Sequence, residues 1–386
     1  MKNFKFQNPT KIIFGEDQFS SLVSEIPANS KVLITYGGGS IKKNGIYDQV
    51  TKALSSFEVV EFGGIPSNPE YAVLLEAIEL IKKEEITFIL AVGGGSVIDG
   101  TKFLAAAAHS TETNPWSLLT DGKPILTGMP FGTVLTMPAT GSEMNWGSVI
   151  TRKETKEKLT MMGPGLSPQF SILDPRVVAS IPKRHLANGL ADAFSHVLEQ
   201  YITYPADALL QDRFSESILK TLIEVAPTLL ETPSDHKAAA NYMWSCTMAL
   251  NGLIEAGAPT DWAVHAIGHE LTALYGIDHA KTLAVIAPSH YRYNLENKKE
   301  KLAQFAQRIW NVTEGNVEEK ALAGIDKLEE FFHYLGIETS LSKYTDEYEG
   351  TAEIIAKRFT DRGWIGLGEL QSVTPDDVEK IVKMSY

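Results

Sequence analysis

The sequence has almost no cysteine and no long apolar run. Cys246 is the only cysteine among 386 residues, so an intrachain disulfide, a thiolate zinc cluster and a CxxC redox pair are all excluded. The longest apolar runs, such as FLAAAA, fall far short of the roughly 20 residues that span a bilayer. Polar residues also interrupt the start, MKNFKFQNPTKIIFGEDQF, which lacks the apolar stretch of a secretory signal. We expect a cytoplasmic protein without a membrane partner.

Positive charge is also scarce. The chain has 35 Lys and Arg residues against 48 Asp and Glu residues, which gives a net charge of −13 at pH 7. Such a charge opposes binding to polyanions, so we expect no nucleic-acid partner. The remaining composition, 44% hydrophobic and 22% charged, is typical of a globular protein, and the length suggests two or three domains.

The two halves of the chain have different patterns. Short runs that are apolar throughout, KVLITY (31–36), ITFILAV (86–92) and FGTVLTM (131–137), alternate with helical stretches in the first half and each ends at a turn. This pattern is typical of parallel strands covered on both faces. Long amphipathic segments, such as 211–231 and 301–312, follow. We predict an α/β domain over 1–180, with a Rossmann-like doubly wound parallel sheet, and an all-helical domain over 181–386.

The turn in AVGGGSVIDGTK (91–102) is a candidate pyrophosphate site. Glycine lets a backbone approach a ligand closely, and the N–H groups at the start of the next helix attract phosphate. A tight turn without a ligand explains one glycine cluster equally well, because the spacing is not GxGxxG. Asp99 and Lys102 have ordinary explanations too, as a helix-start charge and a solvated lysine.

An earlier turn, TYGGGSIKKNG (35–45), bears on which dinucleotide binds. It contains no Asp or Glu, whereas Ser40, Lys42 and Lys43 offer hydrogen-bond donors and positive charge. An acidic side chain near the adenosine ribose is typical of NAD sites, and the 2′-phosphate of NADP needs room and positive charge. The turn therefore favours NADP(H) over NAD(H), unless the two lysines are merely a solvated pair.

A third turn, TMPATGSE (136–143), follows the third apolar run. Ligands of open parallel sheets bind outside the carboxyl ends of the strands, which is where this turn is expected. Thr136 and Thr140 are candidates for contacts with a ribose or a nicotinamide amide.

Two segments carry a candidate metal site. Asp192 and His196 are four residues apart in ADAFSHVLEQY (191–201), as are His265 and His269 in DWAVHAIGHELTALYGIDHAKT (261–282), where His279 follows. Residues four apart share a helical face, and a carboxylate with imidazoles is a donor set for one divalent metal ion. Alone, an Asp–His pair is usually a surface contact, and spacing does not decide which histidines are ligands. No HExxH motif occurs, so a metalloprotease is not indicated.

The ordered set GGGSVIDGTK, TMPATGSE, ADAFSHVLEQY and HAIGHELTALYGIDH resembles the iron-containing alcohol dehydrogenase family, especially its butanol dehydrogenase and aldehyde reductase branch. The resemblance covers essentially the whole chain, including NPTKIIFG near the start and ILDP at the domain junction. It implies a metal-dependent enzyme that transfers hydride between NADP(H) and a small aliphatic aldehyde or primary alcohol, such as butanal or butanol. It also implies a homodimer.

The resemblance further implies roles for individual residues. Asp192, His196, His265 and His279 match the ligands of one metal ion, Fe²⁺ or Zn²⁺. His269 matches a histidine that lies near the substrate without being a ligand, and it is our candidate for proton transfer. Residues matched to dinucleotide contacts are Gly38, Gly39, Ser40, Gly94, Gly95, Ser96, Asp99, Thr136, Thr140 and Lys158. Gly38 stands near the position where NAD-preferring members tend to carry Asp, which again favours NADP(H).

Two other functions stay open. The same two-domain architecture resembles that of glycerol dehydrogenases and dehydroquinate synthases, so a polyol dehydrogenase is an alternative. A metal-binding protein whose dehydrogenase activity has decayed is a further alternative, although the intact turns and the complete ligand set argue against it.

Overall fold

The computed structural model describes all 386 residues, which form two compact units. Residues 7–182 and 231–247 form the α/β unit, and residues 1–6, 183–230 and 248–386 form the helical unit. The units differ from the predicted ranges in three segments, because residues 1–6 belong to the helical unit and residues 181–182 and 231–247 belong to the α/β unit. The division into a dinucleotide-binding domain over 1–180 and a metal-binding, catalytic domain over 181–386 stays a prediction.

A six-stranded sheet is the centre of the α/β unit, with all neighbouring strands parallel in the order β1-β8-β5-β4-β2-β3. Three of these strands overlap the predicted apolar runs, and β5 has the predicted bounds. The strands are β1 Lys11–Phe14, β2 Lys31–Thr35, β3 Glu58–Phe62, β4 Phe88–Gly94, β5 Phe131–Met137 and β8 Phe170–Leu173, with a separate antiparallel pair, β6 Gly147–Arg152 and β7 Glu157–Met162.

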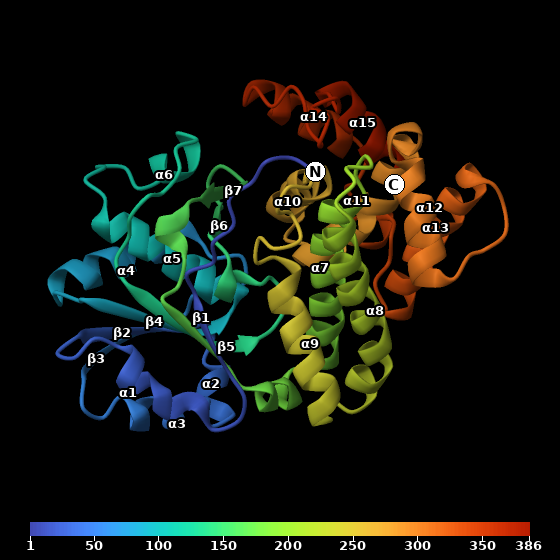
Figure 1. Cartoon of the computed structure of the whole chain (residues 1–386). Coiled ribbons are helices and arrows are strands. Elements are labelled where there is room, and N and C mark those ends of the chain that lie inside the picture. Colours follow the sequence, from blue (N-terminus) through green and yellow to red (C-terminus); the bar gives the residue numbers. More distant parts are fainter. The chain divides into compact units, whose positions relative to one another are not determined.

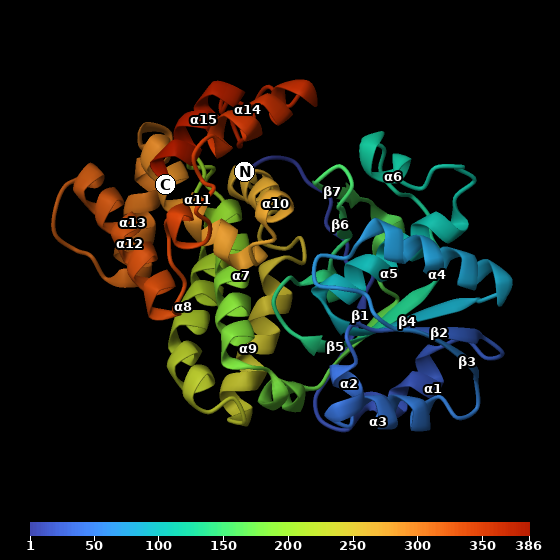
Figure 2. The same cartoon turned by 180° about the vertical axis from the view of Figure 1, so that it is seen from behind.

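Helices cover both faces of this sheet, as predicted for a doubly wound fold. Figures 1 and 2 show α4 and α5 on one side and α1 and α3 on the other. The helices are α1 Leu22–Glu25, α2 Ser40–Lys43, α3 Ile46–Ala53, α4 Tyr71–Lys83, α5 Gly95–His109 and α6 Ser117–Thr120. Most of α9, His236–Ala249, also packs on this unit, since the Tyr242 hydroxyl donates to the Pro138 carbonyl at 2.5 Å.

The helical unit contains the second half of the chain, and the prediction of a helical region there is confirmed. Its helices are α7 Lys183–Tyr201, α8 Leu209–Glu231, α10 Ala263–Tyr275, α11 His279–Tyr293, α12 Leu295–Trp310, α13 Val317–Tyr334, α14 Thr351–Asp361 and α15 Pro375–Met384. α11 packs against both α7 and α10 (Figure 1), which brings the helices with the predicted metal ligands together. None of the helices combines the length and apolar character needed to cross a membrane.

Candidate metal and cofactor sites

Three of the predicted metal ligands come together in the helical unit. The ligand atoms of Asp192, His265 and His279 lie within 4.8 Å of one another. Asp192 comes from α7, His265 from the first turn of α10, and His279 is the first residue of α11. Asp192 and His265 are buried, and the His279 side chain is 21% exposed. One carboxylate and two imidazoles at this separation suit a divalent metal ion.

His196 lies beside this group of three. Its Nδ1 is 3.8 Å from Oδ1 of Asp192, and its ring centroid is 4.6 Å from that of His265. Burial lowers the pKa of His196 to about 4, so its imidazole is neutral at pH 7, which is the form that binds metals. Oδ1 of Asp192 and Nδ1 of His196 are buried without a hydrogen-bond partner. Such atoms are unusual in folded proteins, and a bound cation would satisfy them.

His269 lies one turn further along α10. Its ring centroid is 4.9 Å from that of His279 and 6.2 Å from that of His265. It is partly exposed, whereas His265 is buried. The predicted proton-transfer residue is therefore next to the predicted ligands and is accessible to solvent.

Glu199 was not predicted from the sequence, yet it contacts a proposed ligand directly. Its Oε1 accepts the N–H of Val264 at 2.7 Å, and its Oε2 accepts the N–H of His265 at 3.1 Å. The same Oε2 forms a short hydrogen bond with Nδ1 of His265. Burial beside Asp261 raises the pKa of Glu199, and the two backbone N–H donors oppose that rise. Glu199 follows Asp192 by seven residues on α7, a spacing that places both on one face.

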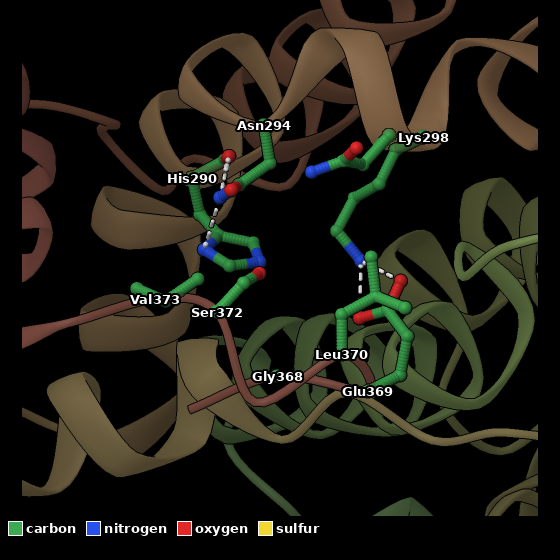
Figure 3. A pocket seen from close by; sticks show the side chains of 9 residues that line it. His290, Asn294, Lys298, Gly368, Glu369, Leu370, Ser372 and Val373 are labelled. Carbon is green, nitrogen blue, oxygen red and sulfur yellow. Dashed lines mark hydrogen bonds and ion pairs between the residues drawn. The ribbon is translucent and has the colours of Figure 1, made fainter. Parts of the chain in front are cut away.

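A buried charged cluster contains Asp261, just before α10, together with His290, Lys298 and Glu369, and Figure 3 shows the last three beside a small cavity. Asp261 accepts from Nε2 of His290 at 2.6 Å and from Nζ of Lys298 at 2.9 Å, and Lys298 also pairs with Glu369 at 2.8 Å. Burial acts to raise the pKa of Asp261, but its interactions with His290 and Lys298 hold that pKa well below its usual range. The backbone N–H of Asp261 donates to the Glu199 carbonyl at 2.8 Å, so the cluster is connected to the metal-site helix α7. The cavity beside the cluster, about 10 Å³, has room for about one water molecule.

The second GGGS turn forms the start of α5 in the α/β unit. A Cβ on Gly95 would collide with the Thr140 side chain, so only glycine allows this close approach. Oγ of Ser96 accepts the N–H of Asn68 at 3.2 Å, and Oδ1 of Asn68 accepts from Nζ of Lys158 at 3.0 Å. Three predicted cofactor residues besides Gly95 thus lie around one helix N-terminus, and Asn68 links two of them without having been predicted.

Asp99 and Lys102 have internal partners. The two carboxylate oxygens of Asp99 accept from Oγ of Ser142 at 2.6 Å and from the N–H of Val149 at 3.1 Å, so Asp99 positions the turn after β5. Nζ of Lys102 donates to the carbonyl of Gly147 at 2.8 Å. Lys102 is fully buried, so its interpretation as a solvated lysine is wrong. Lys102 also contacts Asn145, just before β6, and burial lowers its pKa to about 8.

The first GGGS turn is open on its outer side. A Cβ on Gly38 or Gly39 would meet no atom within 4 Å, and Ser40 is exposed. Lys42 is not merely solvated, because its Nζ pairs with Glu61 at 3.0 Å. It also lies over the rings of Tyr36 and Tyr47, at 4.8 and 4.5 Å from their centroids. Glu61 therefore neutralises part of the positive charge that the sequence places at this turn.

Thr136 is the second-to-last residue of β5, and it is partly exposed. All the predicted cofactor residues belong to the α/β unit, and all the predicted metal residues belong to the helical unit. The chemistry of the first set is backbone N–H groups, hydroxyls and a lysine, which suits a phosphorylated dinucleotide. The chemistry of the second set suits a divalent metal ion.

Two family descriptions match nearly the whole chain. The description "iron-containing alcohol dehydrogenase" matches residues 9–175, and "Fe-containing alcohol dehydrogenase family, C-terminal" matches residues 186–386.

Individual relatives are similar over their full lengths. The NADPH-dependent aldehyde reductase YqhD of Escherichia coli K12 is 48% identical over 383 residues, which cover 99% of each chain. The probable NADH-dependent butanol dehydrogenase 1 of Bacillus subtilis 168 is 41% identical over 390 residues and 100% of each chain. The crystal structure of YqhD from E. coli K-12 superposes with a TM-score of 0.98 at 46% identity, covering 100% of this chain and 99% of that one.

Proposed function

Because the chain belongs to the iron-containing alcohol dehydrogenase family, we propose that it reduces small aliphatic aldehydes, such as butanal, to primary alcohols and catalyses the reverse oxidation. The observation that carries the proposal is the group formed by Asp192, His265 and His279, whose ligand atoms lie within 4.8 Å of one another. The relatives named as an aldehyde reductase and a butanol dehydrogenase support the substrate class.

Asp192, His196, His265 and His279 are the proposed ligands of one Fe²⁺ or Zn²⁺ ion. The unpartnered buried atoms of Asp192 and His196 support this assignment, as does the neutral state of His196. When bound, a divalent ion supplies Lewis acidity toward the substrate oxygen, and a nicotinamide supplies or accepts the hydride. The chain itself contributes orientation, because α7, α10 and α11 place the ligand atoms of Asp192, His265 and His279 within 4.8 Å of one another.

His269 is proposed to exchange a proton with the substrate oxygen, directly or through water. Replacing His269 by Ala is expected to lower turnover of butanal by about 100-fold or more, which is the usual contribution of a general acid or base. Bound metal should stay at the wild-type level, because Asp192, His265 and His279 remain. Turnover is measured as NADPH oxidation, and metal content by elemental analysis of the same sample. Loss of the metal from the variant would contradict this role and make His269 a ligand.

The dinucleotide is proposed to bind the α/β unit with its pyrophosphate at Gly94, Gly95 and Ser96, where α5 begins. The N–H groups at that helix start attract phosphate, and the absence of Cβ atoms permits close approach. Thr136 and Thr140 are proposed to contact the nicotinamide end. Lys158 is proposed as a further contact, and Asp99 as the residue that positions the turn of Thr140 through Ser142.

NADP(H) is the proposed cofactor form, with the adenosine end at Gly38, Gly39 and Ser40. This turn offers an open backbone and a hydroxyl without a carboxylate in its own sequence. Glu61 opposes the preference by pairing with Lys42, whereas Lys43 is a second exposed cation of the turn. NADPH is named in one relative and NADH in another, and initial rates with both forms distinguish them.

The test is the initial rate of butanal reduction with NADPH and with NADH, on protein stripped of metal and reloaded with Zn²⁺ or anaerobic Fe²⁺. We expect metal-dependent turnover, with a higher kcat/KM for NADPH. A higher kcat/KM for NADH would overturn the cofactor proposal alone. Turnover of glycerol but not of butanol would instead support a polyol dehydrogenase.

A cytoplasmic homodimer is the remaining part of the proposal. β1 is an edge strand of the sheet, so its outer backbone groups have no strand partner within the chain. Light scattering at several protein concentrations measures the oligomeric state, and a monomer at all of them would contradict the dimer.

A further inference from the structure

The side chain of Glu199 makes three hydrogen bonds, and all of them go to the start of α10. Two are accepted from the backbone N–H groups of Val264 and His265, and the third joins Oε2 to Nδ1 of the His265 ring. Glu199 is 1% exposed, so no solvent competes for these donors. A carboxylate in this position therefore fixes both the helix start and the orientation of one imidazole.

This contact bears on which nitrogen of the His265 ring carries the proton. Burial raises the pKa of Glu199, but both of its oxygens accept backbone N–H groups, which favours the ionised carboxylate. An ionised carboxylate can only accept a hydrogen bond, so the single N–H of a neutral imidazole is then on Nδ1. The lone pair is then on Nε2, the nitrogen that faces away from Glu199. Histidines that bind metals commonly donate their second ring N–H to a carboxylate in this way, which makes the imidazole a better ligand.

We propose that Glu199 is a positioning residue of the metal site, which holds His265 in the Nδ1–H tautomer and presents Nε2 to the metal ion. The inference rests on the proposed function. α7 would then set the site in two ways, since it supplies Asp192 and His196 as ligands and Glu199 as the residue that orients a ligand on α10. The competing explanation is that Glu199 only stabilises the start of α10 through the two backbone bonds.

The experiment compares two neutralised buried carboxylates. In Glu199→Gln, one side-chain oxygen becomes an amide group that cannot accept a hydrogen bond, so at least one donor of α10 loses its partner. The matched control is Glu270→Gln: Glu270 is also 1% exposed and lies on α10, but its partners are Arg358, at 2.6 Å, and Arg362. Both variants should destabilise the metal-free protein.

The dissociation constant for Zn²⁺, measured on metal-stripped protein by competition with a chelator, separates the two explanations. We expect Glu199→Gln to weaken Zn²⁺ binding by about 10- to 100-fold and Glu270→Gln to leave it unchanged. Equal weakening in both variants, or unchanged binding in Glu199→Gln, would overturn the proposal. If wild-type protein itself binds no Zn²⁺, Fe²⁺ or Co²⁺, the proposed function fails, and that result is distinct from the others.

A measurement on wild-type protein covers the case in which Glu199→Gln does not fold. Long-range ¹H–¹⁵N correlation spectra of metal-free protein labelled with ¹⁵N-histidine report which ring nitrogen carries the proton, and His265→Gln identifies the signals. We expect His265 to be in the Nδ1–H tautomer at neutral pH. A proton on Nε2 would overturn the proposal whatever the metal affinity is.

Discussion

Replacing His279 by Ala is expected to lower the rate of butanal reduction by roughly a thousandfold, because the several kcal/mol that a Lewis acid contributes would be lost with the metal. His279 is one of the three residues whose ligand atoms lie within 4.8 Å of one another. Its side chain is 21% exposed and stands at the start of α11, so its removal should affect folding less than removal of buried Asp192. The measurement is kcat/KM with NADPH, together with metal content.

The control for this variant is His333→Ala. His333 is exposed near the end of α13, where its Nε2 is 3.1 Å from Oγ1 of Thr339. Its removal should leave both metal content and rate at the wild-type level. If His279→Ala retains the metal and the rate, His279 is not a ligand, and the donor set must be rebuilt from Asp192, His196, His265 and His269.

The sequence predicts the parallel sheet well because its central strands are buried on both faces. The runs at 31–36, 86–92 and 131–137 correspond to β2, β4 and β5, in which most residues are buried. Edge strand β1 and the β6–β7 pair were not predicted, since shorter or half-exposed strands give weaker patterns. The placement of α9 on the α/β unit depends on contacts such as Tyr242 with Pro138, which no local pattern reveals.

Sequence spacing likewise accounts for some of the site residues and not for others. Spacing on a helix pairs Asp192 with His196 and would also have found Glu199, since seven residues return to the same face. No such rule predicts that Glu61 on β3 pairs with Lys42, or that buried Lys102 donates to the Gly147 carbonyl at the start of β6. These contacts join segments far apart in sequence, so they follow from the tertiary structure alone.

Replacing Lys298 by Met is expected to destabilise the helical unit by about 3–5 kcal/mol, because it leaves a buried charge without its partner. The Lys298 side chain is 3% exposed, and its Nζ lies 2.9 Å from Asp261 and 2.8 Å from Glu369. Asp261 keeps His290 in the variant, whereas Glu369 keeps no cation. The free energy of unfolding is measured by urea titration followed by far-UV circular dichroism.

Two further variants test whether the unpaired charge is the cause. Lys299→Met removes the neighbouring lysine, which is 34% exposed and pairs with Glu296, so it should change stability by less than about 0.5 kcal/mol. Lys298→Met combined with Glu369→Met should recover part of the loss, because neither buried charge then remains alone. If the double variant is less stable than Lys298→Met, the loss reflects packing and not electrostatics. The backbone N–H of Asp261 donates a hydrogen bond to the Glu199 carbonyl. Any variant that disorders this cluster is therefore also expected to weaken metal binding.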